Sequence, residues 1–273
     1  MTALTTSYVD RPEGRLAYDD NAVDGPLVVA APGMGDVRHV YRHIRSAMAD
    51  AGIRFVTMDL RGMGDSSTEW AQLDDAAVAS DYLALIDHLD AGPAVVVGNS
   101  LSCASAVLAA TDEPDKVSGL MLLGPFVRDV PMKWWQKAAF GAMLMPPWGR
   151  SAWVSYYRKA LNPGDKPADL DEYVAGLSKN LSEPGRFASF RTISGSSHAE
   201  SGRRLGRVTQ PTVVVMGTAD PDFPDPTAEA NHIAGIMGAD VVLSDGSGHY
   251  PQAQDPDLVA GELVALVERV ARD

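Results

Sequence analysis

The sequence predicts an α/β protein in which a mostly parallel sheet carries helices on both faces and a helical insertion interrupts the alternation. Short runs rich in valine alternate with longer segments of helical spacing, which implies right-handed crossovers between parallel strands. The alternation stops between residues 126 and 207. With 273 residues, of which 45% are hydrophobic and 22% charged, the chain is long enough to close one substantial core.

The expected elements follow one another in a regular order along the chain. The turn-rich residues 11–14 favour an opening hairpin of strands 7–9 and 16–18. Near-continuous β-branched runs, typical of strands buried on both faces, predict further strands at 27–31, 53–58, 94–97, 117–123, 212–216 and 241–243. Apolar residues at helical spacing predict helices at 37–51, 74–89, 101–110, 226–237 and 256–271.

The segment 126–207 differs in composition from the rest of the chain. It holds 11 of the 19 aromatic residues, and it carries 13 Lys and Arg against seven Asp and Glu. The remaining residues carry ten basic and 29 acidic side chains. We therefore expect a helical cap at 126–207 inserted into a core domain made of residues 1–125 and 208–273.

Composition also excludes several classes of protein. The net charge of −13 argues against a general nucleic-acid binder, and a single cysteine, Cys103, cannot form an intrachain disulfide. No apolar run approaches the roughly 18 to 20 residues that span a bilayer. The first ten residues lack the pattern of a secretory signal, so a cytoplasmic protein is expected. No phosphate loop or metal-ligand spacing is present, and we expect no cofactor and no metal.

The strongest chemical signal is the segment Gly98-Asn99-Ser100-Leu101-Ser102, which lies between an expected strand and an expected helix. A sharp turn at this point holds its central residue in a strained conformation, so the flanking residues Gly98 and Ser102 must be small. The turn raises the Ser100 hydroxyl above the sheet edge at the positive end of a helix. We therefore expect Ser100 to be a nucleophile.

A serine nucleophile needs a base and an acid that orients the base. His249 follows the last expected strand within a run of small residues, and we expect it to be the base. Asp220 follows the strand 212–216 and is the favoured acid. Three other aspartates remain open as the acid, namely Asp222, Asp225 and, farther away, Asp129.

An oxyanion hole needs two backbone N–H groups directed at the reacting carbonyl. Leu101, directly after the nucleophile, supplies one of them. The second is expected from Met34, because the loop Pro32-Gly33-Met34-Gly35 follows the strand 27–31. Glycines in this loop let the backbone approach a bound ligand closely.

Together these motifs resemble the α/β-hydrolase superfamily. The turn Asp59-Leu60-Arg61-Gly62-Met63-Gly64-Asp65-Ser66 is similar to the D-x-R-G-x-G-x-S turn of its esterase-like members. The resemblance implies an eight-stranded, mostly parallel sheet with one antiparallel strand near the N-terminus, and a helical cap at the position of the insertion. The chain departs from the usual pattern at Ser102, which replaces a glycine, and at Asn99, where many lipases have histidine.

The resemblance implies a hydrolase that passes through an acyl-enzyme, with a hydrophobic carboxylic ester or thioester as substrate. Ser100 argues against the dehalogenases and epoxide hydrolases of the superfamily, which use aspartate at the elbow. The same triad also serves carbon–carbon bond hydrolysis, perhydrolysis, and acyl transfer or cyclisation. A ligand-sensing protein with slow turnover is a further alternative, because the Ser-x-Ser elbow occurs in hydrolase-like signalling proteins.

The aromatic residues of the cap indicate the substrate class. Four tryptophans of the insertion are candidates for a pocket lining, namely Trp134, Trp135, Trp148 and Trp153. Aromatic side chains offer a large apolar surface, so the expected partner is a small hydrophobic acyl or aromatic compound. The alternative is that many of these residues pack the cap itself and its seam with the sheet.

Overall fold

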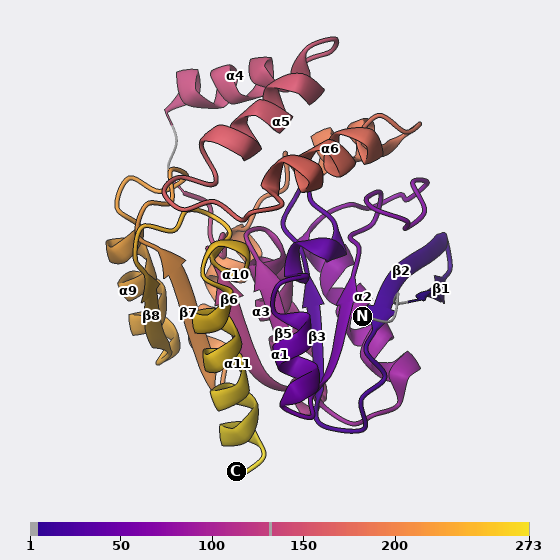
Figure 1. The fold of residues 1–273 in the computed structure, drawn as a ribbon, viewed down its shortest axis with the longest axis vertical. Coiled ribbons are helices and arrows are strands. Elements are labelled where there is room, and N and C mark those ends of the chain that lie inside the picture. Colours follow the sequence, from indigo (N-terminus) through magenta and orange to yellow (C-terminus); the bar gives the residue numbers. More distant parts are fainter. Residues whose placement is uncertain (1–4, 131–132, 273) are drawn as a thin grey trace.

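A computed structural model describes residues 5–130 and 133–272, and its centre is an eight-stranded sheet (Figure 1). The strand order across the sheet is β1-β2-β4-β3-β5-β6-β7-β8. The strands are β1 (Thr6–Arg11), β2 (Gly14–Asp20), β3 (Leu27–Ala31), β4 (Arg54–Met58), β5 (Ala94–Asn99), β6 (Val117–Leu123), β7 (Thr212–Gly217) and β8 (Asp240–Ser244).

All eight expected strands are present, and their directions match the predicted class. β1 and β2 form the opening hairpin, and β2 is antiparallel to both β1 and β4. From β4 to β8 every pair is parallel. Strands β3 and β5 are fully buried, as their continuous apolar runs predict. The carboxyl ends of these central strands therefore share one edge, where ligands bind in open α/β sheets.

Helices cover both faces of the sheet (Figure 1). On one face α1 (Arg45–Asp50) contacts α11 (Pro256–Val270), and on the other α2 (Asp75–Leu89) contacts α3 (Ser102–Asp112). Helix α9 (Pro226–Met237) packs on β7 and β8. Within the described residues, no helix is both long and apolar enough to cross a membrane.

The expected helix 37–51 is wrong as a single element. The structure has a 3₁₀ turn, η1 (Arg38–Tyr41), followed by the short helix α1. Two side chains of the 3₁₀ turn are buried in specific bonds: Tyr41 donates to the Ala31 carbonyl (2.7 Å), and Arg38 pairs with Asp19 (2.9 Å). These bonds fix the turn whatever the spacing of apolar residues over 37–51, so tertiary contacts override the helical pattern.

The expected helix 256–271 is α11, but a short helix that was not expected, α10 (Pro251–Gln254), precedes it. The chain leaves helical geometry at Asp255, whose φ and ψ are −134° and 60°. A residue before proline is disfavoured in the α region, and Pro256 begins α11. Pro256 therefore separates the two helices.

Five helices lie between β6 and β7, where the cap was expected. They are α4 (Trp134–Met143), α5 (Gly149–Lys159), α6 (Leu170–Asn180), α7 (Arg186–Ile193) and α8 (Ala199–Arg204), followed by the 3₁₀ turn η3 (Leu205–Arg207). Helices α4, α5 and α6 lie beyond the end of the sheet (Figure 1), whereas α8 packs against α3. The limits at 126 and 207 stay predictions.

The turn after β4 is held by buried charges. The Asp59 carboxylate is fully buried, pairs with the Arg38 guanidinium, and accepts hydrogen bonds from the backbone N–H groups of Arg38 (2.7 Å) and Asp65 (2.9 Å). Arg61 pairs with Asp81 of α2 at 2.6 Å. A buried charge is stable only when it is paired and hydrogen-bonded, so this motif anchors the loops beside the sheet edge.

Candidate functional site

Ser100 occupies a sharp turn between β5 and α3. Its φ is 58°, in the left-handed region that few residues other than glycine adopt. Its backbone N–H donates to the Leu123 carbonyl at the end of β6 (2.9 Å), which holds the turn over the sheet edge. A Cβ on Gly98 would lie 2.6 Å from the Cys103 backbone nitrogen, so only glycine fits there. The backbone thus has the geometry of a nucleophile elbow.

Ser102, the departure from glycine in the motif, is fully buried and takes part in the elbow. Its Oγ accepts a hydrogen bond from the Asn99 N–H (2.8 Å) and lies within donating distance of the Ala31 carbonyl (2.9 Å). The hydroxyl therefore links the turn to the neighbouring strand β3. The substitution adds a bond to the turn and leaves its shape intact.

Asn99 has a role that the sequence analysis missed. Its fully buried side-chain amide donates to the carbonyls of Leu123 (3.0 Å) and His249 (3.1 Å). The residue before Ser100 thus ties the His249 loop to the elbow. Its polar side chain at the end of a buried strand was the available signal, because a buried amide requires partners.

We expect Asn99→Ala to destabilise the protein by about 2 kcal/mol, because two buried carbonyls lose a donor. Urea unfolding followed by circular dichroism measures this change. The control is Asn21→Ala, at a less buried position away from the elbow, which removes a donor to the Ile53 carbonyl (2.9 Å) and an acceptor for the Val23 and Phe55 N–H groups. Only Asn99 bonds the His249 carbonyl, so activity should fall in Asn99→Ala and not in Asn21→Ala; an equal activity loss in both would contradict a specific link between Asn99 and the His249 loop.

His249 and Asp220 form a buried pair at the same edge of the sheet. His249 Nδ1 lies 2.7 Å from Asp220 Oδ2, and both residues are 2% exposed. The other candidate acids lie differently. Asp225 caps the N-terminus of α9 by accepting from the Ala228 N–H, and the exposed Asp129 accepts from the Ser197 hydroxyl. The pair leaves His249 Nε2 as the ring nitrogen available for other partners.

A second carboxylate acts on the same imidazole. Asp222 Oδ2 lies 3.8 Å from His249 Nδ1, and the Tyr156 hydroxyl of cap helix α5 donates to Asp222 Oδ1. Burial lowers the pKa of His249, but the carboxylates of Asp220 and Asp222 outweigh burial and raise this pKa to about 9. Burial also raises the pKa of Asp222. The cap therefore contacts a carboxylate that influences the pKa of His249.

Ser100 and His249 are neighbours, although their side chains are not joined. The His249 ring is hydrogen-bonded to Asp220 and makes no hydrogen bond to Ser100 Oγ. Their loops are connected in two ways. The Asn99 amide donates to the His249 carbonyl. The Phe126 N–H donates to the Ser100 carbonyl (3.2 Å), and the centroid of the Phe126 ring lies 5.8 Å from that of the His249 imidazole. Catalytic hydrogen bonds often close only when substrate binds.

The two expected oxyanion donors lie on either side of Ser100. A Cβ on Gly33 would be 2.9 Å from the Ser100 Cβ, so the glycine brings the loop with Met34 against the serine. Among backbone groups of residues 5–130 and 133–272, neither the Met34 nor the Leu101 N–H donates to a carbonyl. Both amides are therefore free to bind an oxygen.

The loop after Met34 is held by the cap, a contact that the sequence did not indicate. Trp153 Nε1 donates to the Gly35 carbonyl (3.2 Å), and the hydroxyls of Tyr157 (2.8 Å) and Tyr173 donate to the buried carboxylate of Asp36. Burial raises the pKa of Asp36 to about 6, although both hydroxyls stabilise its charged form. The conformation of the loop that carries Met34 therefore depends on α5 and α6.

The four cap tryptophans occupy different environments. Trp153 is 2% exposed and packs on Phe190, with ring centroids 4.8 Å apart. By contrast Trp134, Trp135 and Trp148 are 80%, 52% and 53% exposed. Exposure of these three rings does not support the expectation that they line a pocket. A pocket-lining role stays a prediction for the four tryptophans.

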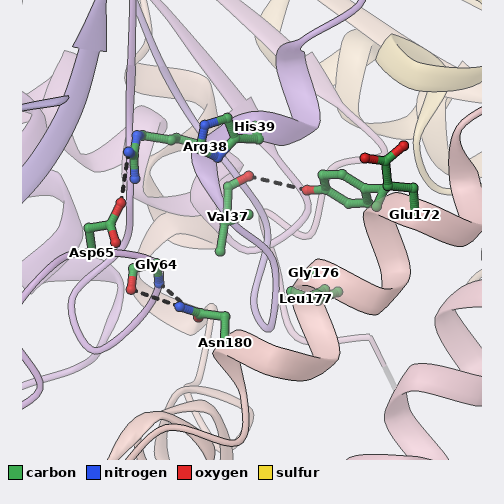
Figure 2. A pocket seen from close by; sticks show the side chains of 10 residues that line it. Val37, Arg38, His39, Gly64, Asp65, Glu172, Gly176, Leu177 and Asn180 are labelled. Carbon is green, nitrogen blue, oxygen red and sulfur yellow. Dashed lines mark hydrogen bonds and ion pairs between the residues drawn. The ribbon is translucent and has the colours of Figure 1, made fainter. Parts of the chain in front are cut away.

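A cavity of about 300 Å³ lies at the seam between α6 and the loops after β3 and β4 (Figure 2). Its lining includes none of the residues Ser100, Asp220 and His249. Reciprocal bonds between Asn180 and the Gly64 backbone (2.9 and 3.2 Å) cross the seam, and Arg38 pairs with Asp65 (2.8 Å) beside it. Polar contacts thus hold this side of the cap to the core.

Asp220, Asp222 and His249 also offer three metal-ligating atoms within 4.8 Å of one another. The 2.7 Å between His249 Nδ1 and Asp220 Oδ2 is a hydrogen-bond distance. Two ligands of one ion, each about 2 Å from it in tetrahedral geometry, would lie farther apart. The arrangement therefore fits a shared proton better than a shared metal ion.

Comparison with known proteins gives a consistent result. The model of the alpha/beta hydrolase family matches residues 28–262. A probable esterase of Oryza sativa subsp. japonica is 25% identical over 253 residues, which cover 89% of this chain and 91% of the relative. An esterase structure from Exiguobacterium antarcticum has a TM-score of 0.84 at 18% identity, covering 97% of this chain and 100% of that one, which shows the fold.

A shorter match has higher identity. A putative non-heme bromoperoxidase of Mycobacterium tuberculosis (strain CDC 1551 / Oshkosh) is 38% identical over 109 residues, 40% of this chain. The match spans about two fifths (41%) of the length of that relative.

Proposed function

Because this chain belongs to the alpha/beta hydrolase family, we propose that it is a serine hydrolase acting through an acyl-enzyme. The observation that carries the proposal is the elbow of Ser100 beside the buried pair of His249 and Asp220. A strained serine at the end of a central strand serves no evident packing purpose. Strain of this kind is concentrated at functional sites.

In the proposed reaction, Ser100 Oγ attacks the carbonyl carbon of the substrate, and His249 Nε2 takes its proton. Asp220 holds the imidazole by Nδ1 and stabilises its cationic form. The backbone N–H groups of Met34 and Leu101 bind the developing oxyanion. His249 then gives the proton to the leaving alcohol or thiol, and water repeats the sequence to release the acid and free Ser100.

A hydrophobic carboxylic ester or thioester is the proposed substrate class. The residues around the imidazole support it, because Phe126 stacks on Phe223 with centroids 4.7 Å apart, and Phe126 also contacts the imidazole edge-on. The partly exposed Met34 adds apolar surface in the loop after β3. An acyl chain that enters this region gains burial free energy in proportion to its apolar area.

Steady-state hydrolysis of p-nitrophenyl esters from acetate to decanoate tests the proposal. Many turnovers, with kcat/KM rising toward medium-length chains, support a hydrolase of hydrophobic esters. A single burst of p-nitrophenol without turnover would instead indicate a ligand sensor. A matched panel of acyl thioesters separates the two substrate classes.

Activity should depend on pH through His249, because only the neutral imidazole accepts the proton of Ser100. With its pKa at about 9, kcat/KM should rise about tenfold per pH unit until it levels near that value. Asp222→Asn removes a negative charge 3.8 Å from Nδ1, so the pKa falls and the rising limb moves to lower pH. The pH profile of kcat/KM for one ester measures this displacement.

Asp225→Asn is the matched control, since this carboxylate lies in the same loop but caps α9. Its pH profile should coincide with that of the unmodified protein. If the rising part of the kcat/KM profile stays at the same pH in Asp222→Asn, or moves to higher pH, a direct electrostatic effect of Asp222 on the base is contradicted.

A further inference from the structure

Helix α4 forms the outermost layer of the cap, farther from the sheet than α5 (Figure 1). No residue of this helix is buried. Trp134 and Trp135 at its start are 80% and 52% exposed, values unusual for the largest apolar side chain. One side of α4 does pack inward, through Phe140 and Met143. The opposite side is an apolar surface without a partner among the described residues.

The apolar surface continues beyond the end of the helix. Met145 is 48% exposed and Trp148 is 53% exposed, and Trp148 Nε1 donates to the Ala142 carbonyl of α4 (3.0 Å). This bond places the third exposed indole against the helix. Three exposed tryptophans and a methionine within 15 residues form a patch of the kind that marks an interaction site.

The charge around this patch is unlike that of the rest of the protein. Residues 130–164 contain no Asp or Glu and five Lys or Arg, whereas the remainder carries 18 basic and 36 acidic side chains. Lys133, Lys137 and Arg150 are exposed, and none of them forms an ion pair within the described residues. The apolar patch is therefore flanked by free positive charge on an otherwise acidic molecule.

We propose that this cap surface, made of Trp134, Trp135, Met145 and Trp148 with Lys133, Lys137 and Arg150, binds the surface of an anionic phospholipid membrane. Interfacial helices combine tryptophans that enter the headgroup region with basic residues that attract anionic lipids. Each Lys or Arg near such a surface adds to the attraction. The patch lies on the membrane without crossing it.

The charge distribution also sets how the protein is oriented on the membrane. An anionic surface attracts the basic outer end of the cap and repels the acidic core domain. Because α4 is the layer farthest from the sheet, it can reach a membrane while the core stays in water (Figure 1). Contact is therefore confined to α4 and the segment that follows it, and binding weakens as salt screens the charges.

Flotation with vesicles of pure phosphatidylcholine, and with vesicles containing phosphatidylglycerol, tests the proposal on the full chain. We expect binding to the anionic vesicles, with a blue shift of tryptophan fluorescence, and little binding to the neutral ones. The variant Trp134→Ser with Trp135→Ser, and the variant Lys133→Glu with Lys137→Glu, should each bind at least about tenfold more weakly, because the first loses two interfacial side chains and the second replaces two attractive charges with repulsive ones.

Two control variants carry the same changes elsewhere. Ile236→Ser with Leu243→Ser removes exposed apolar side chains of the core domain, and Arg15→Glu with Arg272→Glu reverses two exposed charges there. Both should bind anionic vesicles like the unmodified protein, and thermal unfolding checks that all variants fold. Absence of binding, or equal binding by the tryptophan variant, would overturn the proposal. So would concentration-dependent self-association in sedimentation that only the tryptophan variant abolishes, because the patch would then bind a second copy.

Discussion

Ser100→Ala should abolish turnover of every ester that the protein hydrolyses, with kcat reduced on the order of 10⁴- to 10⁶-fold. The substitution removes the proposed nucleophile and leaves His249 and Asp220 in place. It also removes only one hydroxyl from a position that already has positive φ, so the fold should be retained. Steady-state kinetics gives the loss, and circular dichroism confirms folding.

Ser105→Ala is the matched control for this experiment. Ser105 lies one turn further along α3, is fully buried, and its Oγ has no hydrogen-bond partner among the described residues. Its removal should leave kcat close to that of the unmodified protein. If Ser100→Ala retains turnover, or is still labelled by a fluorophosphonate, another residue is the nucleophile.

Asp220→Asn should reduce kcat on the order of 10⁴-fold, because an amide at this position can stabilise the wrong tautomer of His249. The carboxylate is 2.7 Å from Nδ1 and buried, so no water can replace it without rearrangement. The same substitution at Asp129, which bonds Ser197 on the protein surface, should leave the rate nearly unchanged. A silent Asp220→Asn together with a severe Asp129→Asn or Asp222→Asn would show that the acid is misassigned.

The sequence predicted the sheet well because its signals are local. Runs such as 27–31 and 117–123 are apolar on both faces, and such runs have few alternatives to a buried strand. The segment 37–51 was wrong as one helix because Arg38 and Tyr41 bond to groups distant in sequence. Periodicity carries no information about those partners.

The site was predictable to the same extent. Ser100, His249 and Asp220 were proposed because each follows a strand, and the structure places all three at the shared edge of the parallel strands; their catalytic roles stay predictions. The contributions of Asn99, Asp36 and Tyr156 were missed, since each depends on the packing of the cap or of a loop against the elbow. The exposure of Trp134 and Trp135 was missed for a related reason, because α4 is apolar on both sides and its pattern does not say which side is covered.

Covalent trapping of the acyl-enzyme tests the central claim most directly. The protein is mixed with a p-nitrophenyl ester, quenched in acid within the first turnover, digested and examined by mass spectrometry. We expect the mass of one acyl group on the peptide that contains Ser100, in an amount that matches the burst of p-nitrophenol. Hydrolysis with no adduct under these conditions, or an adduct on a different residue, would contradict the proposed mechanism.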